Sequence, residues 1–71
     1  MSYEQKFTEY LGELKSGMKA YAIELKEGQN NPLSVLSGGK IQGRGRMICR
    51  DRVVYLEAQG CTNSDAIELQ V

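Results

Sequence analysis

The stretch "GKIQGRGRMICRDR", residues 39–52, decides the expected fold. Residues 40–50 alternate along a predicted β-strand, because successive side chains of a strand point to opposite faces. One face of this strand would carry apolar residues and two glycines, namely Ile41, Gly43, Gly45, Met47 and Cys49. Glycines at two successive inward positions permit a sharp bend and a close approach of another backbone. The sequence therefore predicts one long, strongly bent strand.

The other face of this strand would gather the positive charge of the chain. All four arginines lie in this stretch, and alternation places Lys40, Arg44, Arg46 and Arg50 on one side, about 6–7 Å apart from one i, i+2 neighbour to the next. The planar guanidinium suits bidentate binding of phosphate or carboxylate. Acids of a neighbouring strand, Glu57 or Glu68, would also relieve the repulsion. An anion-binding surface and an ordinary solvated face with cross-strand ion pairs both remain open.

An N-terminal helix precedes the strands. Ser2 and Gln5 fit a capping box, and Phe7, Tyr10, Leu11 and Leu14 recur at helical spacing, which predicts a helix over residues 3–15 ended by Gly17. Residues 18–26 fit either a continuation of this helix or a strand. Because Gly17 interrupts the helical option, we favour a strand with Tyr21, Ile23 and Leu25 inward and the alanines 20 and 22 outward.

Further strands are predicted from turn signals. Residues 33–37 form a short strand that ends at Gly38-Gly39, a pair typical of a two-residue hairpin turn. Asp51-Arg52 permits another tight turn before a strand over residues 53–58. The last strand covers residues 66–71, "AIELQV", and its outer edge would be free for strand addition from another subunit or a partner.

In total, the sequence predicts one helix and about five short antiparallel strands in a single domain, residues 1–71. The fold class is α+β and mainly β. This order of elements resembles the SH3-like and Sm-like barrels, in which an N-terminal helix precedes five bent strands. The resemblance implies a small barrel with the helix over one open end; it implies no functional residues.

The composition argues against most enzyme classes. The 71 residues contain no histidine, which removes the commonest general base, and no nucleophile motif is present. We expect no catalytic residue, no metal and no cofactor. Cys49 is expected in the core beside Met47, and Cys61 in an exposed loop. No signal pattern or membrane-length apolar run appears, so a reduced, cytoplasmic protein without membrane association is expected.

The charges are balanced overall, with nine basic and nine acidic residues, but residues 40–52 hold five basic residues against Asp51 alone, a local balance of +4. The primary hypothesis is a non-enzymatic binding protein that holds a phosphate-bearing ligand, nucleic acid or nucleotide, on Lys40, Arg44, Arg46 and Arg50. The alternative is a protein–protein interaction module that acts as a small regulator, inhibitor or adaptor. Because a core of this size supplies little net stability, a homo-oligomer is expected under either hypothesis.

Overall fold

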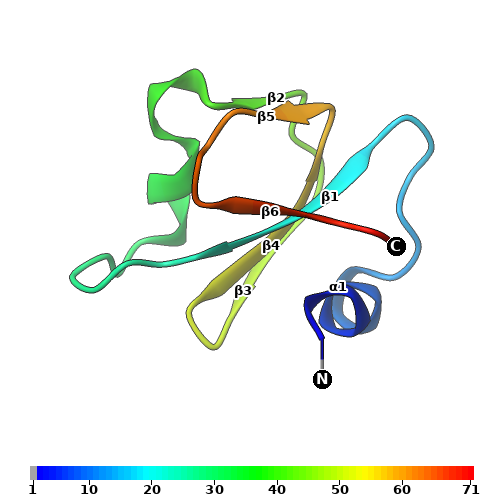
Figure 1. Ribbon diagram of the computed structural model, residues 1–71, viewed down its shortest axis with the longest axis horizontal. Coiled ribbons are helices and arrows are strands. Elements are labelled where there is room, and N and C mark those ends of the chain that lie inside the picture. Colours follow the sequence, from blue (N-terminus) through cyan, green and yellow to red (C-terminus); the bar gives the residue numbers. More distant parts are fainter. Residues whose placement is uncertain (1) are drawn as a thin grey trace.

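The computed structural model describes residues 2–71 (Figure 1). It confirms an α+β protein, mainly of short strands, with one N-terminal α-helix and antiparallel sheets. Neither of the helices in this part of the chain is long and apolar enough to cross a membrane. The elements in chain order are α1 (Tyr3–Leu11), β1 (Lys19–Glu24), the 3-10 segment η1 (Pro32–Gly39), β2 (Ile41–Gln42), β3 (Met47–Arg50), β4 (Val53–Ala58), β5 (Gly60–Cys61) and β6 (Ala66–Leu69).

The strands form two sheets rather than a closed barrel. Four strands make an antiparallel sheet in the order β3-β4-β1-β6, and β2 pairs with β5 in a separate ribbon. Figure 1 shows this ribbon at the end of the molecule away from α1. The four-stranded sheet has two open edges, β3 and β6, so the SH3-like or Sm-like barrel is not confirmed.

Helix α1 begins as its sequence predicts. The Ser2 hydroxyl accepts from the Gln5 N–H, and the Gln5 side chain accepts from the Ser2 N–H, which completes the capping box. The predicted end at residue 15 is wrong. The helix ends at Leu11 because Gly12 adopts a positive φ of 78°, which glycine reaches without steric cost. The apolar stripe is confirmed, since Phe7 is fully buried against the sheet.

Residues 19–24 form a strand, β1, in agreement with the favoured interpretation of residues 18–26. It pairs with β4 and β6, and both of its faces are buried because α1 packs on one side of the sheet and η1 on the other. Tyr21 and Ile23 pack against η1 on one face, as expected for inward residues. Ala20 and Ala22 were expected in solvent, but they pack under α1 with Phe7. Small side chains at these positions let the helix lie close to the sheet.

The predicted strand over residues 33–37 is wrong. These residues belong to η1, which begins where the Asn31 side chain accepts from the Leu33 N–H at 3.0 Å and Pro32 occupies the first turn. This local cap and the fixed φ of proline favour a helical turn over an extended strand. Gly38 and Gly39 do take positive φ values, 75° and 64°, but they end η1 rather than join two hairpin strands.

The long strand over residues 40–50 is also wrong, because it is broken into β2 and β3. Gly43 adopts a φ of 62° and interrupts the alternation between the two strands. The close approach expected at the glycines is confirmed: a Cβ at Gly43 would lie 2.5 Å from the Gln59 side chain, and one at Gly45 would lie 2.6 Å from the Glu57 carboxylate. Residues 40–50 therefore do not present one continuous face.

The C-terminal half follows its predictions more closely. Strand β4 covers residues 53–58 as predicted and is buried along its whole length. Asp51 and Arg52 both take positive φ values, 52° and 62°, and join β3 to β4 in a two-residue turn. Strand β6 occupies residues 66–69 of the predicted 66–71 and lies at an edge of the sheet, as expected.

We predict that Gly45→Ala destabilises the protein by about 1–3 kcal/mol, the usual cost of overpacking. The added methyl group would displace the Glu57 carboxylate, whose Oε1 lies within 2.6 Å of the new Cβ position. Urea denaturation followed by circular dichroism measures the change. Arg44→Ala, an exposed neighbour, is the matched control and is expected to leave the free energy of unfolding unchanged. Equal stability of the two variants would contradict this assignment.

Candidate interaction surfaces

The structure does not place the four predicted ligand-binding residues on one face of one strand. Lys40 follows η1, Arg44 lies in the loop between β2 and β3, and Arg50 ends β3; all three are exposed. Arg46 differs from them, since its guanidinium turns back onto the protein. The premise that these residues share one face of one strand is therefore wrong. Their role in ligand binding remains a prediction.

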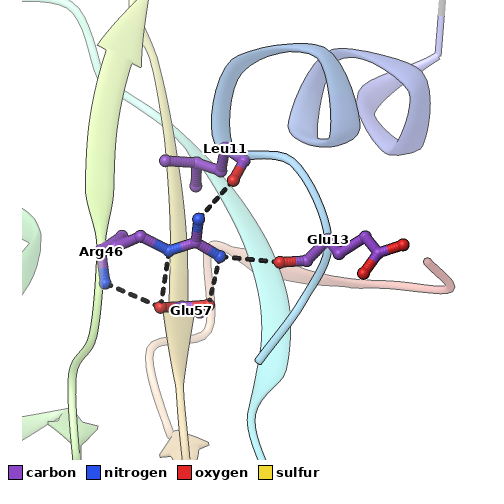
Figure 2. Close-up of polar contacts among 4 residues, drawn as sticks. All are labelled: Leu11, Glu13, Arg46 and Glu57. Carbon is purple, nitrogen blue, oxygen red and sulfur yellow. Dashed lines mark hydrogen bonds and ion pairs between the residues drawn. The ribbon is translucent and has the colours of Figure 1, made fainter. Parts of the chain in front are cut away.

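Arg46 forms an ion pair with Glu57 of β4, one of the two acids that the sequence offered as partners (Figure 2). The pair is bidentate: Nε donates to Oε1 and Nη2 donates to Oε2, both at 3.0 Å. The backbone N–H of Arg46 adds a third hydrogen bond to Oε1, at 3.1 Å. Glu57 is the one charged residue among those buried in the described chain, at 1% exposed, so these bonds compensate its desolvation.

The same guanidinium also holds the segment that follows α1. Its Nη1 donates to the carbonyl of Leu11, and its Nη2 donates to the carbonyl of Glu13 at 2.8 Å. These carbonyls belong to the end of the helix and the residues after it, where backbone acceptors lack helical partners. Arg46 therefore joins α1, the β3 edge and β4, as Figure 2 shows, and this side chain has a structural role.

The ion pair changes the titration of Glu57. Hydrogen bonds from the Arg46 side chain lower the pKa of Glu57 from 4.5 to about 2, and backbone N–H groups of Arg46 and Lys15 act in the same direction, although burial by itself raises it. Because the folded pKa lies below the ordinary value, the ionised carboxylate stabilises the folded state fully above pH 4.5. This stabilisation is lost as the pH falls from 4.5 toward 2.

The remaining arginines of the basic stretch differ in their contacts. The Arg50 guanidinium lies over the ring of Tyr10, 5.3 Å from its centroid, in a cation–π contact. Arg52 donates to the carbonyls of Lys26 and Gln29, at 2.7 and 3.0 Å, and so fixes the loop after β1. Arg44 forms neither of the ion pairs found within residues 2–71. It is the arginine whose charge is most available to a ligand.

Within residues 2–71, no exposed aromatic platform accompanies these charges. Tyr55 is 1% exposed and packs edge-on against Tyr3 and Tyr10. Stacking of nucleic-acid bases needs exposed rings. The aromatic side chains near the basic stretch therefore serve the core, and any nucleic-acid contact there would be made to phosphates.

Lys40 borders a small polar pocket of about 160 Å³ between η1 and the loop before β6. An ion pair between Lys26 and Asp65, 3.1 Å long, lies at its wall. Two acidic residues, Glu24 and Asp65, and two basic residues, Lys26 and Lys40, line the pocket, so their formal charges cancel. The pocket therefore lacks the excess positive charge that an anion site needs, and Lys40 is separated there from the arginines.

The two cysteines lie on the η1 side of the sheet. Cys49 packs beside Met47 against the buried cluster that contains Ile23 and Leu56, in agreement with its predicted inward position. Cys61 was expected in an exposed loop, but it forms part of β5 and is half-buried against the same cluster. Pairing of Cys61 with Ile41 across the β2-β5 ribbon accounts for this burial.

Strand β6 presents a different kind of surface. Its neighbour in the sheet is β1 on one side, and its other edge is unpaired within residues 2–71. Ile67 and Val71 are 48% and 49% exposed, although Leu69 between them is buried. Because Ile67 is directly opposite Ala22, it lies on the α1 face of the sheet.

A shallow groove of about 440 Å³ runs beside this edge, between α1 and the C-terminal residues. It is lined by Glu4, Gln5, Thr8, Glu9, Gln70 and Val71, and the atoms exposed in it are mostly carbon atoms of these side chains. The sequence predicted the free edge but missed the groove. Residue spacing carries no signal for it, because its two walls, α1 and the C-terminal residues, come together only in the folded chain.

Comparison with known proteins found no matching family model, no matching curated protein and no matching solved structure.

We predict that Arg46→Met lowers the melting temperature at pH 7 by on the order of 10 °C. Loss of one partner of a buried ion pair costs a few kcal/mol, and each kcal/mol moves the melting temperature of such a domain by roughly 4–8 °C. Differential scanning calorimetry measures the shift. The matched control is Arg44→Met, two residues away, which is expected to have the same melting temperature as the wild type.

The same pair of variants tests the pH dependence. As the pH falls from 4.5 toward 2, the wild type loses the contribution of ionised Glu57, so the difference between wild type and Arg46→Met is expected to shrink. A constant difference across this pH range would contradict the assigned ion pair.

Proposed function

We propose that this chain is a non-enzymatic interaction module that binds an extended segment of a partner protein by strand addition at β6. The observation that carries the proposal is the unpaired β6 edge, where Ile67 and Val71 are half exposed beside the groove along α1. This is the regulator, inhibitor or adaptor class that the sequence offers as its alternative.

Strand addition needs a rigid template with free backbone groups. An edge strand presents a row of unpaired N–H and C=O groups to which an incoming strand can bond. Strand β6 is held in register by four residue pairs with β1, which is itself paired with β4 along its full length. Strand β6 is therefore already ordered and loses little conformational entropy when a partner strand binds.

The surroundings of the edge define the chemistry of the partner. An apolar side chain opposite Ile67 would cover its exposed surface on the α1 face. Glu4 and Glu9 line the groove next to Val71, so a basic side chain of the partner would be favoured there. On the other face Glu68, which is opposite Tyr21, adds a further negative charge. The expected ligand is an extended segment that alternates apolar and basic residues.

We predict that a short fluorescein-labelled peptide of alternating valine and lysine binds the wild-type protein. Ile67→Lys is expected to weaken this binding by at least about tenfold, because a charged residue at an edge strand opposes strand pairing. Fluorescence anisotropy measures the affinity. Leu33→Lys is the matched control, since Leu33 is 54% exposed and lies in η1 instead of β6.

Two results would contradict the proposal. One is equal affinity of the Ile67→Lys and Leu33→Lys variants for the peptide. The other is equal binding of a peptide in which glutamate replaces every lysine, because these residues would lie on the same face as Glu68, which disfavours them.

A phosphate-bearing ligand, nucleic acid or nucleotide, remains a second proposal. The exposed guanidinium of Arg44, which has no ion pair within residues 2–71, favours it, with Arg50 as a further contact. Because Arg46 is bound to Glu57, a variant that removes Arg46 would report on stability as well as on binding. The informative change therefore spares Arg46.

We predict that Arg44→Ala combined with Arg50→Ala weakens binding of a labelled single-stranded oligonucleotide. Each lost phosphate contact is expected to reduce the slope of log affinity against log salt by about 0.7. Anisotropy titrations at several salt concentrations measure this slope. Lys15→Ala combined with Lys19→Ala removes the same charge from exposed positions elsewhere and serves as the control. An identical loss in both double variants would contradict a specific site.

A further inference from the structure

The two open edges of the four-stranded sheet lie at opposite ends of its strand order, with β3 at one edge and β6 at the other. Neither edge has a second strand partner within residues 2–71. Helix α1 covers one face of this sheet, and Figure 1 shows it beside the strands. A second copy of the chain would therefore find a free edge on either side of the sheet.

The two edges carry opposite charge. On the β3 side, Arg44 and Arg50 are exposed, and Arg46 is neutralised by Glu57. On the β6 side, Glu68 is exposed, Asp65 is paired with Lys26, and residues 63–71 contain no basic residue. Glu4 and Glu9 of α1 add acidic groups at the groove beside Val71. Charges of this kind attract the β3 edge of one copy to the β6 edge of another.

The strand directions permit this contact within one continuous sheet. Each neighbouring pair in the order β3-β4-β1-β6 is antiparallel, so β3 and β6 run in opposite directions. If two copies lie side by side in the same orientation, β6 of the first is antiparallel to β3 of the second. Both α1 helices then cover the same face of the extended sheet.

The register of the sheet indicates which residues meet. Ile48 is opposite Tyr55, Tyr55 is opposite Ala22, and Ala22 is opposite Ile67, so Ile48 and Ile67 belong to the same row across the sheet. When the row is continued into a second copy, Ile67 lies beside that copy's Ile48. Antiparallel pairing from this row places Met47 opposite Glu68 and brings Arg50 to the end of β6 at Asp65. Arg44, in the loop before β3, lies toward the Val71 end, where Glu4 and Glu9 line the groove.

We propose that the chain assembles head to tail with itself, through antiparallel pairing of β6 in one copy with β3 in the next. The inference rests on the proposed function of β6 as an edge that accepts a strand, and it identifies that strand as Met47–Arg50 of a second copy. An apolar pair, Ile67 with Ile48, lies at the centre of the contact. The positive charges of Arg50 and Arg44 flank it.

Symmetric pairing of like edges is disfavoured by the same charges. Two β6 edges would bring Glu68, Glu4 and Glu9 of both copies together with no basic residue from residues 63–71 between them. Two β3 edges would bring together the exposed Arg44 and Arg50 of both copies. A head-to-tail contact uses two different surfaces and generates a closed ring or an open filament, depending on the rotation between copies.

A head-to-tail contact can be tested by mixing two variants, each of which is blocked at a different edge. Ile67→Lys blocks the β6 edge and leaves β3 free, and Arg44→Glu combined with Arg50→Glu blocks the β3 edge and leaves β6 free. All three positions are exposed, which limits the effect on folding, and circular dichroism melting checks it. Size-exclusion chromatography with light scattering gives the mass of each species against the monomer mass of 7.9 kDa.

We expect the wild type and Leu33→Lys to form concentration-dependent multimers, and each edge-blocked variant alone to be a monomer. An equimolar mixture of the two blocked variants is expected to form a species of twice the monomer mass. This species arises because one variant supplies β3 and the other supplies β6. Lys15→Glu combined with Lys19→Glu matches the charge reversal at other exposed positions and is expected to assemble as the wild type does.

A wild type that stays monomeric at every concentration overturns the inference. Dimers of the β3-blocked variant alone also overturn it, because they indicate symmetric β6 pairing. A monomeric chain that still binds the valine–lysine peptide overturns self-assembly alone and leaves the proposed function intact. A wild type that neither assembles nor binds the valine–lysine peptide refutes both the self-assembly and the proposed function.

Discussion

The bidentate ion pair between Arg46 and Glu57 is the constraint on which the arrangement of the other elements depends. Glu57 lies on β4, next to the centre of the sheet, and is almost completely buried. A carboxylate in that position destabilises a protein unless a cation and hydrogen bonds compensate it. Arg46 provides both, and its two remaining donor contacts reach the carbonyls of Leu11 and Glu13. One side chain thus fixes the end of α1 relative to the sheet.

The four-stranded sheet has covered faces and open edges. It divides the core into two clusters, one under α1 and one under η1, so both of its faces are covered. Within residues 2–71, no element pairs with the outer edges of β3 and β6. These edges are the surfaces of this sheet that are available for strand pairing. This is why the proposed functions concern the edges and not a cavity in the core.

In the basic stretch, the net charge of the segment is larger than the charge that its side chains leave available to a ligand. Its balance of +4 is a property of residues 40–52 alone. In the folded chain, Arg46 is neutralised by Glu57, Arg50 lies over Tyr10, and Arg52 holds the loop after β1. Alternation failed to predict a single face because Gly43 takes a positive φ and breaks the strand. The partners of these arginines are eleven to forty positions away in sequence, so spacing within the stretch could not identify them.

Features that depend on near neighbours along the chain could be predicted from the residues alone. The capping box at Ser2, the apolar stripe of α1, the turn at Asp51-Arg52 and the bounds of β4 are of this kind, because hydrogen bonds and periodicity over a few residues specify them. Tertiary structure decided the rest. It buried Ala22 under the helix, engaged Arg46 internally and left Ile67 exposed at an edge. Each of these outcomes depends on which distant segment packs against the residue, and residue spacing carries no information about that.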